Sequence, residues 1–237
     1  MTQTRAFIYG TDMLTYSLKR RDRRTLEISV LPNQSIEVVA PHDADDATIE
    51  RRMRKRAGWI RRQLAYFEQF EPRTPERKYV SGETHLYLGR RYRLKVIRAV
   101  QRDIKLKGGY IEVHTHRPRN QEAVRQQLED WYNQKAHDQF RKRLADSLAR
   151  FPANAEFEPV GLIIRRLKGR WGSMSAAGRL VLNRRLVEAA RHEIDYVITH
   201  ELCHRRFHHH GPQFYKLLGR VMPDWEKRKT SLERRLT

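Results

Sequence analysis

The stretch His200-Glu201-Leu202-Cys203-His204 forms an H-E-x-x-H pattern. Residues four apart lie on one face of a helix, one turn apart. On a helix, His200 and His204 can therefore offer two imidazole nitrogens to one metal ion. Glu201 is rotated by about 100° from His200, so it misses the ion but reaches a water beside it. Two histidines, an open coordination position and a carboxylate base are the parts of zinc-assisted hydrolysis.

The flanking residues predict that this pattern lies on a helix. Ile194, Val197, Ile198 and Leu202 recur at helical spacing. Gly211-Pro212 follows, as is typical of a helix end. The alternative is a pair of surface histidines in an arginine-rich protein. That alternative leaves Glu201 and the later histidines unexplained.

A third zinc ligand is expected among His208, His209 and His210. His208 would extend the helical stripe, but three ligands on one straight helix span about 12 Å, too far to meet at one ion. The chain must turn back first. His210 precedes Gly211-Pro212 and a second helical pattern that begins at Phe214, so His210 is favoured over His209, and both over His208.

Three segments are informative together: H-E-L-C-H with His210 and Phe214-Tyr215, Arg170-Trp171-Gly172-Ser173-Met174-Ser175, and Leu182-Asn183-Arg184-Arg185-Leu186. They resemble motifs of the YgjP-like metal-dependent hydrolases, zinc metallopeptidases of the zincin group related to SprT/WLM proteins and minigluzincins. The resemblance runs from about Tyr16 onward. Two departures are Met174, where the family has cysteine, and Tyr215, where it often has tryptophan. The matching segments are Ser81-Gly82-Glu83, Leu88-Gly89-Arg90-Arg91-Tyr92, Arg170-Trp171-Gly172-Ser173-Met174-Ser175, Leu182-Asn183-Arg184-Arg185-Leu186, Ile194-Asp195-Tyr196-Val197, the H-E-L-C-H segment with His210 and Phe214-Tyr215, and Met222-Pro223-Asp224-Trp225.

The resemblance implies a zinc-dependent peptidase acting on peptides or proteins. His200, His204 and His210 would bind Zn²⁺, and Glu201 would be the general base. A strand near residues 170–183 would border the cleft and pair with an extended substrate. Arg170, Trp171 and Asn183 are the candidate cleft residues, although a core position is an equal alternative for Trp171.

Three residues near the pattern have further predicted roles. Asp195 or Glu193 could accept a hydrogen bond from a ligand histidine. Cys203 could close the metal site as a fourth ligand, but we interpret it as a small buried helix residue.

Composition indicates a soluble globular protein. The 237 residues are 39% hydrophobic and 32% charged, with a single cysteine and therefore no internal disulfide. No apolar run is long enough to span a membrane, and the N-terminal residues lack the apolar core of a signal peptide. We expect a cytoplasmic protein without a membrane partner.

The formal net charge of +21 favours polyanionic partners, namely nucleic acid or nucleotides. The basic residues are scattered, and the alternative is a solvated arginine-rich surface. No base-reading signature appears, so any nucleic-acid binding is expected to be non-specific.

Hydrophobic periodicity predicts an α+β fold. Residues 1–118 would form a β-rich lobe with one helix, and residues 119–237 a zincin-like catalytic unit, with one continuous domain as the alternative. The lobe would contain a β-meander over residues 14–40, a helix capped by Asp43–Asp46 and ending near Phe70, a proline-containing linker over residues 71–76, and strands over residues 79–118 with a hairpin turn at Gly108-Gly109. A long helix is predicted for residues 121–150. His85, His114 and His116 are interpreted as strand-surface residues, and the sequence shows no internal repeat.

Other functions compete with proteolysis. The same metal chemistry can hydrolyse nucleotides or other phosphate esters. A protease recruited to nucleic acid and a binding module with a vestigial metal site are further alternatives. An intact Glu201 argues against the last.

Overall fold

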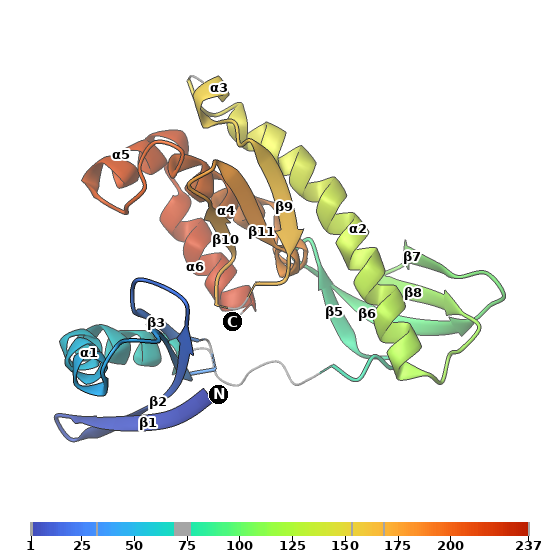
Figure 1. The fold of residues 1–237 in the computed structure, drawn as a ribbon. Helices are drawn as coiled ribbons and strands as arrows, with labels where there is room; N and C mark the ends of the chain where they lie inside the picture. Colours follow the sequence, from blue (N-terminus) through green and yellow to red (C-terminus); the bar gives the residue numbers. More distant parts are fainter. Residues whose placement is uncertain (1, 32, 69–76, 153, 168, 237) are drawn as a thin grey trace. The chain divides into compact units, whose positions relative to one another are not determined.

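The chain folds into two compact units, Met1–Thr74 and Pro75–Leu236. Figure 1 shows a computed structural model that describes residues 2–31, 33–68, 77–152, 154–167 and 169–236. Helices and mixed sheets are both present, which confirms the predicted α+β class. The expected linker over residues 71–76 lies outside the described residues.

The N-terminal unit is a four-stranded sheet with one helix. In the sheet order β1-β2-β4-β3, the central strands β2 and β4 are parallel. The predicted meander is therefore wrong, because a meander pairs each strand with its neighbour in sequence. β1 was not predicted. The elements are β1 (Thr2–Tyr9), β2 (Asp12–Arg21), β3 (Glu27–Val30), β4 (Ile36–Pro41) and α1 (Asp46–Glu68).

Helix α1 begins where the acidic run predicts. The Asp45 carboxylate accepts a hydrogen bond from the Thr48 N–H at 2.6 Å, which satisfies a free donor of the first turn. Its apolar stripe of Ile49, Met53, Ala57 and Ile60 is fully buried against the sheet. This stripe and the inward side chains of the strands form the separate core of the N-terminal unit.

The second unit starts with another four-stranded sheet and a long helix. The sheet order is β5-β6-β8-β7, and the central strands β6 and β8 are parallel. Gly108 and Gly109 take φ of 55° and 81° at the predicted β7–β8 hairpin. Asn120 caps the following helix. The elements are β5 (Thr84–Tyr87), β6 (Arg90–Arg98), β7 (Asp103–Lys107), β8 (Tyr110–Thr115) and α2 (Gln121–Leu148).

The same topology therefore occurs twice, which the sequence analysis missed. Each copy has a parallel central pair, an antiparallel pair on either side of it and a helix after the last strand. The strands β4 and β8 both contain Ile-Glu-Val, at residues 36–38 and 111–113, with the same alternation of buried and half-buried side chains. The two segments lie 75 residues apart in the sequence. The repeat is hard to recognise there, because alternating buried and exposed side chains are a general property of β-strands.

The rest of the second unit carries the H-E-x-x-H segment. A small sheet of order β10-β11-β9 has β10 at its edge, and β11 runs parallel to β9. The elements are α3 (Asn154–Phe157), β9 (Gly161–Arg165), β10 (Gly172–Met174), β11 (Arg179–Asn183), the 3-10 helix η1 (Arg184–Glu188), α4 (Arg191–Cys203), α5 (Pro212–Val221) and α6 (Trp225–Leu236).

One apolar core joins the second sheet to η1 and α4. Leu94 and Val113 of the sheet belong to the same buried cluster as Leu186 of η1 and Ile198 of α4. Helix α2 contacts β8, η1 and α4, so it packs against the sheet and against these two helices (Figure 1). The unit boundary accordingly lies near residue 75, whereas the sequence placed it after residue 118.

None of the helices in the described ranges combines the length and the apolar character needed to cross a membrane.

Candidate metal centre

The N-terminus of α4 is fixed by a buried carboxylate. Glu193 has no exposed surface, and its Oε2 accepts the Ala190 N–H at 2.7 Å. The same carboxylate accepts hydrogen bonds from Ser231 at 2.6 Å and from Arg235 at 2.9 Å, both on α6. These contacts hold the start of the helix about two turns before His200 and three turns before His204.

Helix α4 presents His200 and His204 on one face. The two imidazole ring centroids are 5.2 Å apart, as expected for residues one turn apart. The helix ends at Cys203, and His204 is its C-cap. The Phe207 carbonyl oxygen lies 2.8 Å from His204 Nδ1, so a proton on Nδ1 leaves Nε2 free as an electron-pair donor.

The turn after α4 brings His210 back to the pair. His210 Nε2 lies 3.0 Å from His200 Nε2, and its ring centroid is 4.7 Å from that of His204. One ligand atom from each histidine lies within 4.8 Å of the other two. Pro212 is the first residue of α5, and Gly211 is its N-cap. The chain reversal predicted from Gly211-Pro212 therefore occurs.

Phe214 packs beneath the three imidazoles. Its ring centroid lies 5.0, 4.7 and 4.8 Å from those of His200, His204 and His210, and its side chain is fully buried. An aromatic ring in this position limits how far each histidine can rotate.

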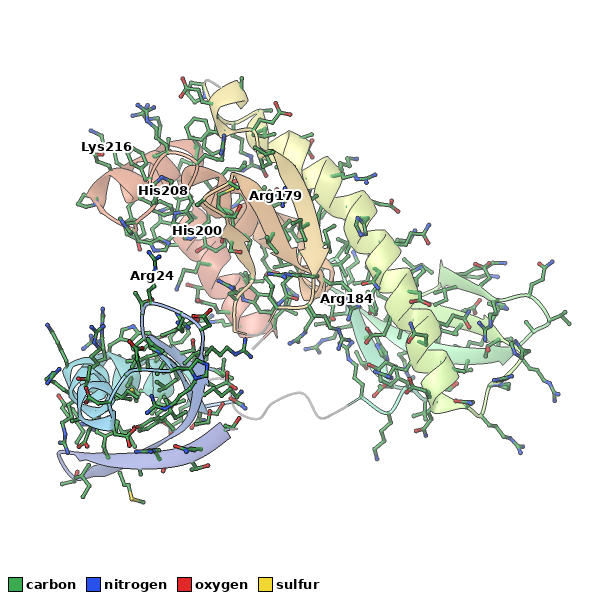
Figure 2. All side chains as sticks on the ribbon, viewed as in Figure 1. Arg24, Arg179, Arg184, His200, His208 and Lys216 are labelled. Atoms are coloured by element: carbon green, nitrogen blue, oxygen red, sulfur yellow. The ribbon has the colours of Figure 1, made fainter. Side chains whose placement is uncertain are left out.

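The other candidate ligands are not brought to the cluster. His208 and His209 are exposed, and neither belongs to the histidine triad, although His208 lines the adjacent cavity. Figure 2 labels His200 and His208. Cys203 is fully buried outside the triad, and burial raises the pKa of its thiol to about 12. It is a core residue, as predicted.

The donor set fits a zinc ion. Three imidazoles are a known ligand set for catalytic zinc. Two nitrogens at about 2.0 Å from a tetrahedral ion lie about 3.3 Å apart, close to the 3.0 Å between His200 and His210. Burial, together with the neighbouring His210 and His204, lowers the pKa of His200 to about 3, so its ring is neutral at pH 7. A neutral imidazole is the form that binds metal.

Glu201 lies beside the triad in a dry environment. Its side chain is 7% exposed, and burial raises its pKa to about 7. A backbone hydrogen bond from Met174 and the charge of Arg170 act in the opposite direction. A carboxyl group with its pKa near 7 can both accept and return a proton at neutral pH.

Strand β10 passes so close to Glu201 that it needs a glycine there. A Cβ on Gly172 would lie 2.9 Å from Glu201 Cγ and 3.1 Å from Val197 Cγ1. Gly172 thus allows β10 to lie directly against α4.

A cavity of about 600 Å³ opens in front of the triad and Glu201. Its walls come from β10 with its flanks, from α4 and from the turn that follows α4. Its lining residues are Arg170, Trp171, Gly172, Ser173, Met174, Ala176, Tyr196, Val197, His200, Glu201, His204, His208 and His210.

Two of the three candidate cleft residues line this cavity, and one does not. Arg170 and Trp171 are part of its wall. Asn183 is 4% exposed, and its amide donates to the carbonyls of Leu167 and Arg170 at 3.0 Å each. Its carbonyl oxygen accepts from Arg185 N–H at 3.1 Å. Asn183 therefore holds the segment that leads into β10, and its own side chain is not part of the cavity wall.

Asp195 or Glu193 was wrongly predicted from the sequence as the hydrogen-bond acceptor of a triad histidine. The Asp195 carboxylate contacts Arg143 at 3.4 Å and Arg150 at 3.2 Å, and Glu193 binds Arg235, so neither is shown bonding a ligand histidine. The acceptor for His204 is the main-chain carbonyl of Phe207, which no side-chain pattern marks. Phe214, by contrast, was visible as the apolar start of the helix after His210.

A family model for the YgjP-like metallopeptidase domain matches residues 24–235. The chain belongs to the YgjP-like family. The match covers nearly the whole chain, including the triad and β10, and the family is one of metal-dependent peptidases. A search of curated proteins finds no match. For this YgjP-like protein, a metal cofactor follows from the family and agrees with the histidine cluster.

Proposed function

We propose that the protein is a zinc-dependent peptidase in which His200, His204 and His210 hold the ion and Glu201 is the general base. The observation that carries this proposal is the convergence of three imidazole nitrogens within 4.8 Å beside a buried carboxylate in an open cavity.

Each side chain has a distinct task. Zn²⁺ in such a site supplies a Lewis acid, which polarises a carbonyl and makes water more acidic. Glu201 accepts the proton of the attacking water and donates it to the departing amine nitrogen. Phe214 and the Phe207 carbonyl keep the imidazoles in position, and Gly172 lets Glu201 stay beside them.

The edge strand supports a peptide or protein substrate. β10 is an outer strand of its sheet and forms one wall of the cavity. The edge of such a strand offers main-chain groups to an extended peptide. Phosphate-ester hydrolysis is less well supported, because Arg170 is the one lysine or arginine among the lining residues that the structure describes. Phosphoryl transfer typically relies on several cations or two metal ions.

The Glu201→Gln variant tests the proposal. The amide keeps the shape of the side chain but cannot accept a proton, so cleavage of casein should fall by about 10²–10⁴-fold while bound zinc stays equal to wild type. Glu226→Gln, on the exposed part of α6, is the control and should retain full activity. Near-normal peptidase activity in zinc-loaded Glu201→Gln would contradict the assigned base. If the wild type hydrolysed nucleoside triphosphates and did not cleave peptides, the substrate class would be nucleotides instead of peptides.

A further inference from the structure

We propose that the exposed face of α1 binds the phosphate backbone of nucleic acid. The N-terminal unit repeats the fold of β5–β8 and α2, but it lacks the side chains that α2 uses to hold the catalytic helices. Lysine or arginine occupies equivalent positions in α1, at Arg54, Lys55 and Arg56. The proposed binding surface consists of two of these, Lys55 and Arg56, together with Arg52 and Arg62, and is called here the α1 cation stripe.

The two copies correspond residue by residue along their last strand. Ile36 and Val38 of β4 lie 75 residues before Ile111 and Val113 of β8, and all four are buried. Each strand pairs in parallel on one side and antiparallel on the other. The repeat is therefore in register through the sheet.

The correspondence continues into the helices without an insertion. Asp45 and Asn120, again 75 residues apart, are the residues whose side chains cap α1 and α2. The buried pairs that follow keep the same spacing: Ile49 and Val124, Met53 and Leu128, Ala57 and Tyr132. Residues 49–57 of α1 and residues 124–132 of α2 thus present equivalent faces, so the other positions within these two segments can be compared directly.

In α2, the positions beside the buried stripe bind the catalytic half of the chain. Glu129 pairs with Arg184 of η1 at 3.0 Å, and Arg184 also lies over the Tyr132 ring. Trp131 is buried against Tyr87 of β5, with ring centroids 5.0 Å apart. The contacts of Arg184 hold η1, which immediately precedes the metal-binding helix, against α2.

In α1, cations replace these groups. The positions of Glu129, Asp130 and Trp131 are taken by Arg54, Lys55 and Arg56. Glu129 pairs with Arg184, whereas α1 has Arg54 at the equivalent position, and the buried Trp131 corresponds to the exposed Arg56. With Arg54 in place of Glu129, α1 offers no carboxylate at this position for an arginine equivalent to Arg184. The change in charge favours an anionic partner.

The α1 cation stripe has no internal counter-charge. Its four side chains are exposed, and no carboxylate of the described residues lies within 4.0 Å of them. Arg54 and Arg61 of the same helix are instead paired, with Glu50 at 2.7 Å and Asp12 at 3.0 Å. At 3.6 residues per turn the stripe follows one side of the helix for about 15 Å, which is enough to meet several backbone phosphates.

Nucleic acid fits this surface better than a lipid surface does. A helix that lies in a membrane interface exposes an apolar face to the acyl chains. The apolar face of α1 is already buried against its own sheet. Three of the four cations are arginine, whose planar fork of donors matches phosphate oxygens. Figure 2 shows side chains with nitrogen tips extending outward around this helix.

A pair of charge-matched variants tests the proposal in the full-length protein. The first replaces Arg52, Lys55, Arg56 and Arg62 with alanine. The control replaces Arg98, Arg119, Arg141 and Lys142, which are exposed in the second unit and also lack a carboxylate partner among the described residues. Binding of a labelled 20-base-pair DNA duplex is measured by fluorescence anisotropy over a range of salt concentrations, with circular dichroism to confirm folding.

The stripe variant should bind DNA at least about tenfold more weakly than wild type at low salt. Its log–log salt slope should be shallower by about 0.9 for each lost phosphate contact, or about 3 to 4 in all. The control should keep the wild-type slope. Equal loss in both variants would mean that the charge acts over the whole surface, and would overturn the proposal. So would no binding by the wild type at low salt, or stripe-dependent binding to phosphatidylserine vesicles without DNA binding. Peptidase activity is expected to be unchanged in the stripe variant, so this result is independent of the metal centre.

Discussion

Gly172 lies directly against Glu201, the proposed general base. Gly172→Ala places a methyl group 2.9 Å from Glu201 Cγ and 3.0 Å from its Oε1. Because Glu201 is buried on a packed helix, the carboxylate must shift, and a shift near 1 Å can cost about 10²-fold in rate. We expect casein cleavage to fall by about that factor while the three histidines still bind zinc.

Gly161→Ala is the matched control for this glycine. Gly161 starts β9 in the same small sheet, and a Cβ there meets no atom within 4 Å. Its activity should equal that of wild type. Equal activity in both alanine variants would show that the contact between β10 and Glu201 does not matter for turnover.

His85 links stability to pH. The sequence placed it on a strand surface, but the side chain is fully buried and bonds Glu83 at 2.9 Å. Burial, and then the charge of Arg77, lowers its pKa below the ordinary 6.5, although Glu83 and Glu188 act against this shift. Below pH 6.5 the unfolded state therefore binds a proton that the folded state rejects. The stability that neutral His85 provides is complete above pH 6.5 and is lost as the pH falls toward the folded-state pKa.

Urea unfolding at pH 7.5 and pH 5.5 measures this linkage. The difference in midpoint between the two pH values should be smaller for His85→Gln than for wild type, because glutamine does not titrate. His137→Gln, at an exposed position of α2, should leave the difference unchanged. If His85→Gln kept the whole wild-type pH dependence, its burial would not be the cause.

At the scale of elements, α4 depends on its link to α6. Arg235 binds the fully buried Glu193 and also donates to the Gly89 carbonyl at 3.0 Å. Arg235→Ala leaves a buried carboxylate without its cation, which costs about 3–5 kcal/mol for a fully buried pair. Because the arginine is partly exposed, we expect a loss of about 2–3 kcal/mol in the free energy of unfolding.

Arg234→Ala is the control for the α4–α6 link. Arg234 is the adjacent residue on α6 and is exposed. Denaturant titration should give a midpoint close to wild type for Arg234→Ala and a clearly lower one for Arg235→Ala. Equal midpoints would argue that the α4 N-terminus does not need the ion pair.

Elements with local signals could be predicted from the sequence, whereas pairings between distant strands could not. The caps at Asp45 and Asn120, the Gly108-Gly109 turn and the reversal at Gly211-Pro212 each depend on a few neighbouring residues. The parallel pairing of β2 with β4 joins residues about 20 apart, and alternation in each strand fits a meander equally well. The repeat was missed for the same reason, since most outward residues differ between the copies.

For the candidate site, too, residues with local sequence signals could be predicted and residues that depend on distant contacts could not. His200, Glu201 and His204 share one helix, and His210 follows a turn with a clear signal, so their positions were predictable. Asn183 was misplaced because its side chain serves the backbone of a distant loop. The spacing of residues in the sequence does not indicate these hydrogen bonds to the Leu167 and Arg170 carbonyls.

At the scale of the whole molecule, two separate cores predict that the second unit can stand alone. The triad, Phe214 and Glu193 all lie within residues 77–236, and their apolar cluster shares no member with that of the N-terminal unit. We expect a protein beginning at residue 77 to fold and to bind the same amount of zinc as the full chain. Circular dichroism and metal analysis check this. An unfolded product would show that the N-terminal unit is required for the second core.

The central claim is that three particular histidines form one metal site. Zinc content after dialysis, measured by plasma mass spectrometry, tests it most directly in wild type, His210→Ala and His208→Ala. His208 is the control because it lies in the same turn but outside the triad. The account predicts about one equivalent of zinc in wild type and in His208→Ala, and a strong loss in His210→Ala. Loss of zinc from His208→Ala with full retention in His210→Ala would contradict it.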